Sequence, residues 1–119
     1  MIIRGKVVSG VGKGAYFVEK YEHLFEYAVG FKPFYGTLNI IVDNVPDLKN
    51  PTKITPGGKF KPIKCYAAEL KIKGENIDVF VIRPEATRHP ENILEIIAPM
   101  CIKETYNVKD GDEAECSLE

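Results

Sequence analysis

Short runs of apolar and β-branched residues, separated by glycine, proline and polar residues, dominate the chain. Such runs are typical of strands, because branched side chains suit a pleated sheet and successive side chains point to opposite faces. We therefore predict strands at residues 2–8, 15–18, 37–42, 63–72, 77–82, 93–98 and 114–118.

One segment follows a helical pattern instead. Its apolar residues recur at the i, i+3, i+4, i+7, i+8 spacing of an amphipathic helix, and Gly30 stands where a helix C-terminus favours glycine. The pattern predicts one helix over residues 19–29. Residues 101–106 are expected to form only a short helical turn.

Proline and glycine mark residues 43–62 as a long irregular excursion. The segment holds four prolines and the pair Gly57-Gly58, and loops of this length are usually functional lids or disordered. Residues 73–76 predict a four-residue hairpin turn, and residues 109–112 predict a turn before the last strand.

Many short strands with one helix inserted early predict an all-β fold. We expect residues 1–119 to form one domain, a small closed or nearly closed β-barrel, because closure removes exposed sheet edges. The chain shows no strand–helix–strand alternation, so a parallel sheet is not expected.

The amino-acid composition indicates which kinds of binding partner are expected. Sixteen basic and seventeen acidic residues give a net charge of −1 without long runs of one sign, which disfavours nucleic-acid binding. The three cysteines are far apart and predict neither disulfides nor a zinc site. With no apolar stretch of membrane-spanning length, we expect a cytoplasmic monomer that does not bind membranes.

The stretch Gly36-Thr37-Leu38-Asn39 carries the first candidate chemistry. Residues two apart in a strand share a face, so Thr37 and Asn39 present a hydroxyl and an amide oxygen side by side. Neutral oxygens of this kind can complete the shell of a magnesium ion already held by phosphates. The alternative is that both residues merely cover a solvated strand face.

A glycine-rich loop follows the first strand, with glycines at positions 10, 12 and 14. Neither the Rossmann nor the P-loop spacing is present, and residues 15–18 are expected to continue as strand. Three glycines nevertheless allow backbone N–H groups to converge on an anion, and Lys13 adds a charge. An ordinary flexible hairpin loop is the alternative.

Glu95 lies within the apolar run of residues 93–98. A carboxylate there is costly unless it has a partner or faces a cavity, and a raised pKa would suit it to act as a general base. The alternative is that it points outward and has no role. Thr87 precedes it in a polar loop, and Phe34, Tyr35 and Tyr66 could line an aromatic slot, although core packing is commoner for such residues.

Taken together, these segments resemble the archaeal-type CTP-dependent riboflavin kinases. The resemblance extends in order and spacing over nearly the whole chain, and its most specific parts are G-T-L-N and E-I-I-A-P-M. The matching segments are residues 7–17, 30–39, 95–100 and 108–112. It implies a six-stranded cradle-loop β-barrel that transfers the γ-phosphate of CTP to the 5′-hydroxyl of riboflavin, giving FMN and CDP.

The resemblance also implies a role for particular residues. It assigns the nucleotide phosphates to Gly10, Val11, Gly12, Lys13, Gly14 and Ala15, and the cytidine nucleotide to Met100, Cys101, Ile102 and Lys103. It assigns one Mg²⁺ to Thr37 and Asn39, and the flavin to Thr87 and Glu95, with Glu95 as a possible general base. Ala15 departs from the family, which often has a basic residue there, so only backbone contacts are expected from it.

On this interpretation, the flavin ring lies in a barrel interior narrowed by Phe34 and Tyr35, with residues 43–62 folding over it as a lid. Two other functions stay open at this stage. One is a non-enzymatic barrel that regulates or docks onto nucleic acid or protein, and the other is a flavin or nucleotide carrier without chemistry. The preference for CTP over ATP follows from the resemblance alone.

Overall fold

The structure is a computed structural model that describes residues 1–10, 14–57, 61–84 and 92–118. The strands are β1 (Ile2–Val8), β2 (Leu38–Val42), β3 (Thr52–Ile54), β4 (Ile63–Ile72), β5 (Glu75–Pro84), β6 (Ile93–Ile97) and β7 (Glu113–Leu118). The helices are α1 (Gly14–Lys20), α2 (Glu22–Val29) and α3 (Ile102–Thr105).

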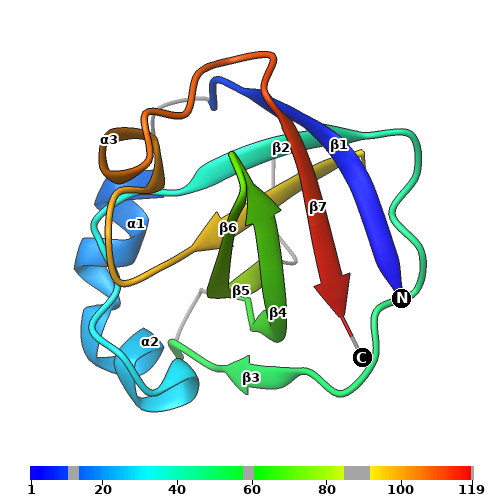
Figure 1. Ribbon diagram of the computed structural model, residues 1–119. Coiled ribbons are helices and arrows are strands. Elements are labelled where there is room, and N and C mark those ends of the chain that lie inside the picture. The colour runs from blue at the N-terminus through cyan, green and yellow to red at the C-terminus, as the bar shows by residue number, and fades with distance from the viewer. Residues whose placement is uncertain (11–13, 58–60, 85–91, 119) are drawn as a thin grey trace.

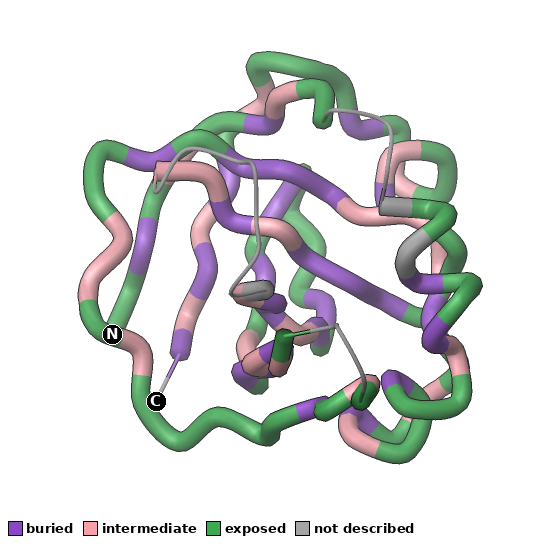
Figure 2. The backbone as a smooth tube through the Cα atoms, turned by 180° about the vertical axis from the view of Figure 1, so that it is seen from behind, coloured by how far each residue is buried: buried purple, intermediate pink, exposed green. Residues whose placement is uncertain are grey.

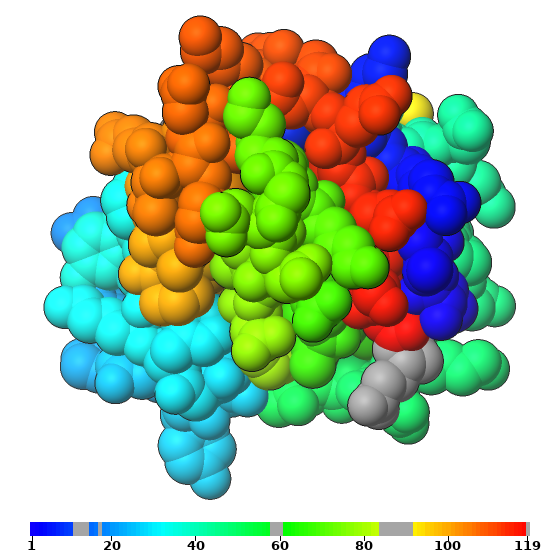
Figure 3. Space-filling model, viewed as in Figure 1, coloured from blue at the N-terminus to red at the C-terminus, as the bar shows by residue number. Residues whose placement is uncertain are grey.

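All strands pair antiparallel in a seven-stranded sheet of order β3-β4-β5-β6-β2-β1-β7. A further pairing of β7 with β4 closes β4, β5, β6, β2, β1 and β7 into a ring (Figure 1). β1 and β7 lie side by side on one flank, in blue and red (Figure 3). The predicted six-stranded barrel is confirmed, and β3 is an additional strand that pairs with the first residues of β4.

Gly5 allows the close approach of β1 to β2 that this closure needs. A Cβ at residue 5 would lie 2.1 Å from the carbonyl oxygen of Ile41. Backbone cannot move aside as a flexible side chain can, so only glycine fits at this point of the ring.

The barrel interior is a filled apolar core. Along β2, the side chains of Leu38, Ile40 and Val42 are buried within it, and Tyr66 joins them from β4. Phe34 and Tyr35 instead lie on the surface, 41% and 38% exposed. The prediction of a flavin ring inside a barrel narrowed by these two aromatic residues is therefore wrong, because aliphatic side chains occupy that space.

A second apolar layer lies between the outer face of the sheet and the helices. Val18 of α1 and Phe25 of α2 are fully buried against the outward side chains of Cys65, Ile82 and Ile97. This layer places α1 and α2 over the β6–β5–β4 side of the barrel (Figure 1).

Two local predictions are corrected here. Residues 15–18 are helical, not a strand, and the predicted helix over residues 19–29 is two helices that meet at Tyr21. The apolar residues of 15–18 fit the period of a strand as well as that of a helix. The helix is favoured because it buries Val18 in the second apolar layer. The predicted end is confirmed, since Gly30 has a φ of 83° and its N–H donates to the Glu26 carbonyl.

The β4–β5 turn is tighter than predicted. Only Lys73 and Gly74 separate the strands, and both have positive φ, 52° and 76°. Two residues of positive φ match the right-handed twist of paired strands, so the ladder continues to the turn. The predicted helical turn near residue 101 is confirmed as α3.

Most of the 43–62 segment that the structure describes is irregular, as predicted, except for β3. It runs around the barrel with mainly exposed residues from 43 to 53 (Figure 2), and Val45 and Leu48 pack against the barrel core. Its role as a lid stays a prediction. Within the described residues, no helix has the length and apolar character needed to cross a membrane.

Candidate active site

Asn39 of β2 and Thr37, which comes just before this strand, lie side by side on the outer face of the sheet, as the strand period predicts. The Asn39 amide nitrogen donates to the Thr37 hydroxyl oxygen at 3.5 Å. Asn39 is only 5% exposed, and its Oδ1 is buried with no hydrogen-bond partner in the described residues. Burying an unpaired amide oxygen costs roughly 1–3 kcal/mol, so this oxygen is suited to a ligand that supplies the missing contact.

The donors at this site fit a magnesium ion. An amide oxygen and a hydroxyl oxygen are hard ligands, and the hydroxyl has a second lone pair beyond the one that Asn39 uses. The described residues contain no cluster of three or more His, Cys, Asp or Glu that could hold a metal. A metal–nucleotide complex would bring phosphate oxygens as negative ligands of its own.

Glu95 faces the same site from the neighbouring strand. The β2–β6 register pairs Asn39 directly with Glu95, and the β5–β6 register pairs Glu95 with Ile82. Directly opposed residues of antiparallel strands point to the same face, with Cβ atoms about 4.5–5.5 Å apart. The half-buried Glu95 therefore shares the outer face with Asn39, while its neighbours Leu94 and Ile96 fill the barrel.

Gly10 packs directly against the Asn39 side chain. A Cβ at residue 10 would lie 2.3 Å from Nδ2 of Asn39 and 3.5 Å from its Oδ1. Gly10 thus lies against the candidate metal ligand, and a larger residue at this position would displace the amide. Val11, Gly12, Lys13 and Thr87 lie outside the described residues, whereas Gly14 begins α1 and Ala15 is exposed.

The tetrapeptide Met100-Cys101-Ile102-Lys103 leads into α3. The Ile102 side chain is 4% exposed and belongs to the barrel core, so only its main chain is available to a ligand. The carbonyls of residues 101, 102 and 103 accept bonds from Thr105, Tyr106 and Val108. Lys103 is half-exposed, and its Nζ donates to Asp110 at 2.9 Å.

Two contacts that sequence reasoning missed hold the chain before Thr37. The Phe34 N–H donates to the Ala98 carbonyl at 2.8 Å, which fixes this segment beside the end of β6. The Tyr35 hydroxyl donates to the Glu22 carboxylate of α2, and this hydrogen bond raises the pKa of Tyr35 above its usual value. No spacing in the sequence signals either contact, since the partners lie on different elements.

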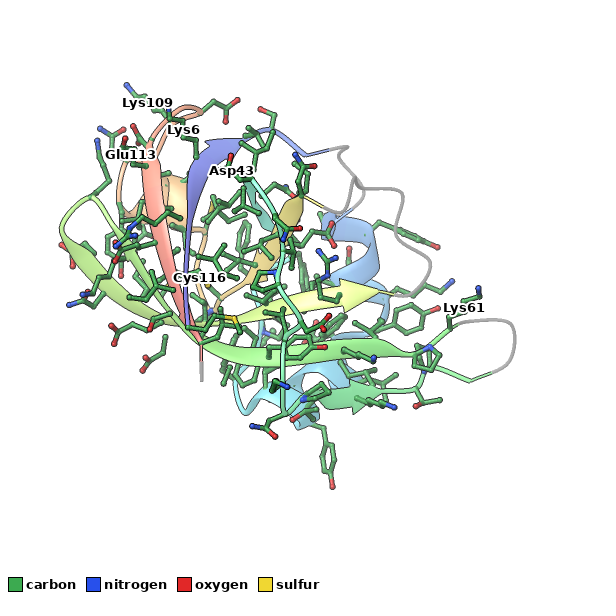
Figure 4. All side chains as sticks on the ribbon, turned by 90° about the vertical axis from the view of Figure 1, so that its right-hand side faces the viewer. Lys6, Asp43, Lys61, Lys109, Glu113 and Cys116 are labelled. Atoms are coloured by element: carbon green, nitrogen blue, oxygen red, sulfur yellow. The ribbon has the colours of Figure 1, made fainter. Side chains whose placement is uncertain are left out.

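A separate hollow of about 930 Å³ lies elsewhere on the barrel surface. Its lining includes charged residues of both signs, among them Lys6, Asp43 and Glu113 (Figure 4), and excludes Thr37, Asn39 and Glu95. Its size alone does not make it the reactive site. The buried oxygen of Asn39, for which the described residues supply no partner, is the stronger indication of a ligand.

Comparison with known proteins identifies the family. The model of the family CTP-dep_RFKase, described as a domain of unknown function, DUF120, matches residues 7–118. The chain belongs to this family. The resemblance to CTP-dependent riboflavin kinases is thereby confirmed.

Curated relatives of this family carry the name riboflavin kinase. That of Methanocella arvoryzae is 36% identical over 126 residues, covering 99% of this chain and 57% of the relative. That of Thermococcus kodakarensis is 40% identical, covering 93% and 56%, and that of Saccharolobus solfataricus is 35% identical, covering 93% and 70%. The chain thus spans a little over half the length of the first two relatives.

Proposed function

We propose that residues 1–119 form a CTP-dependent riboflavin kinase domain, which transfers the γ-phosphate of CTP to the 5′-hydroxyl of riboflavin and yields FMN and CDP. The observation that carries the proposal is the buried Asn39 Oδ1, which has no hydrogen-bond partner among the described residues. It lies beside Thr37, with Gly10 packed on the amide and Glu95 opposite. Family membership and the relatives named riboflavin kinase support the same reaction.

Thr37 and Asn39 would hold one Mg²⁺ through the hydroxyl and the amide oxygen. When bound, the ion would neutralise charge on the phosphate oxygens of CTP. The Asn39 side chain is buried, and Gly10 packs against its amide. The amide nitrogen faces the Thr37 hydroxyl in the structure, so the amide would turn to present its oxygen, together with that hydroxyl, to one ion.

The loop that starts at Gly10 would bind the phosphates through backbone N–H groups, with Lys13 adding a positive charge. The Met100–Lys103 segment would bind the cytidine through its main chain. Glu95, together with Thr87, would orient the flavin so that its 5′-hydroxyl approaches the phosphate, and the Glu95 carboxylate would accept the hydroxyl proton. The flavin would lie on the outer face of the sheet with Glu95, since the barrel interior is filled.

The direct test is a triphosphate panel. Purified protein is incubated with riboflavin, Mg²⁺ and CTP, ATP, GTP or UTP in turn, and FMN is separated by chromatography and measured by fluorescence. We expect FMN with CTP, little with the others, and none when EDTA removes the metal. Absence of FMN with CTP would overturn the proposal, and flavin or nucleotide binding without turnover would favour the carrier function. Monomeric state and cytoplasmic location stay predictions.

A further inference from the structure

Asp110 joins two segments that are far apart in sequence. Its carboxylate accepts a short hydrogen bond from the Ser9 hydroxyl through Oδ2 and another from Lys103 Nζ, at 2.9 Å, through Oδ1. Ser9 is the last residue before the glycine-rich loop. Lys103 is the last residue of the tetrapeptide Met100-Cys101-Ile102-Lys103, which leads into α3. One carboxylate therefore connects the start of one predicted nucleotide segment to the end of the other.

The backbone around Asp110 is itself held in place. The Gly111 N–H donates to the Val7 carbonyl at 2.8 Å, and the Val7 N–H donates to the Asp112 carbonyl at 2.9 Å. The Asp112 carboxylate accepts the Lys109 N–H at 2.8 Å, which closes the turn. Asp110 thus projects from a turn that is hydrogen-bonded to the end of β1.

We propose that Asp110 is a positioning residue for the nucleotide, which sets Ser9, at the start of the glycine-rich loop, and the segment that ends at Lys103 relative to each other before CTP binds. The inference rests on the proposed function, because it assumes that both segments bind the nucleotide. Asp110 contacts neither the candidate metal ligands nor Glu95 in the hydrogen bonds described, so it acts through Ser9 and Lys103.

Asp110 contributes to nucleotide binding rather than to the global stability of the fold. Asp110, Ser9 and Lys103 lie at the surface, where ion pairs add little to folding. Two charge-assisted hydrogen bonds nevertheless hold Ser9 and Lys103 in place before the nucleotide binds. Without them, part of the binding free energy would be spent on ordering these residues. Loss of Asp110 should therefore raise the KM for CTP and leave the thermal midpoint nearly unchanged.

The test compares Asp110→Ala, Ser9→Ala and the double variant with wild type, measuring KM for CTP and for riboflavin and direct binding of CDP by calorimetry. We expect Asp110→Ala to raise KM for CTP and Kd for CDP on the order of tenfold, as for loss of hydrogen bonds to a charged group. KM for riboflavin should stay within about twofold. Because Ser9 acts through Asp110, adding Ser9→Ala to Asp110→Ala should have little further effect.

Asp78→Ala is the matched control, since Asp78 is an exposed carboxylate on β5 and no part of this arrangement. If Asp110→Ala binds CDP as wild type does while wild type makes FMN from CTP, the positioning role is overturned and the proposed function stands. If wild type itself makes no FMN with CTP, the proposed function fails and this inference fails with it. A fall of several degrees in the midpoint of Asp110→Ala without a change in KM would mark a structural role and also overturn it.

Discussion

Asn39 on β2 and Glu95 on β6 are directly opposed in the antiparallel register, so their side chains share the outer face of the barrel. One is a buried amide whose oxygen has no hydrogen-bond partner in the part of the chain that the structure describes, and the other is a half-buried carboxylate. Gly10 packs against the amide, so a candidate metal ligand, a candidate base and the start of a candidate anion-binding loop meet at one place. This arrangement leads to three predictions, and the buried cysteines lead to two more.

Asn39→Ala should lower turnover roughly a hundredfold or more, because a metal ligand supplies several kcal/mol of charge stabilisation in the transition state. Asn39 is buried, so this is not a surface substitution. The free energy of unfolding should still change by only about 1 kcal/mol. Removing an unpaired buried oxygen stabilises the folded state, and this gain offsets the cost of the small cavity that the substitution leaves. FMN formation across a magnesium titration and urea unfolding measure the two effects. Full activity in a folded variant would remove the metal assignment.

Glu95→Gln should lower kcat about 10² to 10⁴-fold, the usual contribution of a general base, because the amide cannot accept the hydroxyl proton. The side chain keeps its size, so the apparent magnesium affinity should be unchanged. Glu113→Gln, at an exposed carboxylate on β7, serves as the control. Single-turnover rates measured across pH check the assignment, and an unaltered kcat would exclude proton abstraction by Glu95.

Gly10→Ala should inactivate the enzyme by displacing Asn39, because the new Cβ would lie 2.3 Å from the amide nitrogen. If the effect passes through this contact, Gly10→Ala should cost much less in the Asn39→Ala background, where the amide is gone. A double-mutant cycle on residual FMN formation measures the coupling. Additive effects of the two substitutions would show that Gly10 matters for another reason.

Two buried thiols should make stability depend on alkaline pH. Burial raises the pKa of Cys65 to about 12 and that of Cys116 to about 11, from an ordinary value of 9.0. The folded state therefore favours the neutral thiols. Their contribution to the free energy of unfolding is fully present below pH 9 and is lost as the pH rises through 11 and 12. Urea unfolding between pH 8 and 11 should show a decline in stability that Cys65→Ala reduces.

The same burial protects these thiols from reagents. In native protein at pH 8, only the half-exposed Cys101 should react rapidly with a thiol reagent, and the other two should react after unfolding. Three fast-reacting thiols in the native state would contradict the burial of Cys65 and Cys116.

Sequence patterns predicted the elements whose residues carry an unambiguous period. The alternation around Asn39 correctly put Leu38, Ile40 and Val42 in the core and Thr37 with Asn39 on the other face. The glycine at position 30 correctly marked the end of α2. Residues 15–18 were predicted wrongly, because four apolar residues fit a strand as well as a helix until the layer that buries Val18 is known.

The amino-acid sequence by itself determined the barrel class, the family and the identity of the candidate metal ligands. These follow from hydrophobic periodicity and short motifs, which can be recognised in residues that are close together in the sequence. Only the tertiary structure decided that the barrel interior is filled and that the site lies on its outer face. It alone also joined Asp110 to Ser9, 101 residues earlier in the chain. Contacts of that kind depend on strand register and sheet closure, which are set by the packing of the whole chain and by no local pattern.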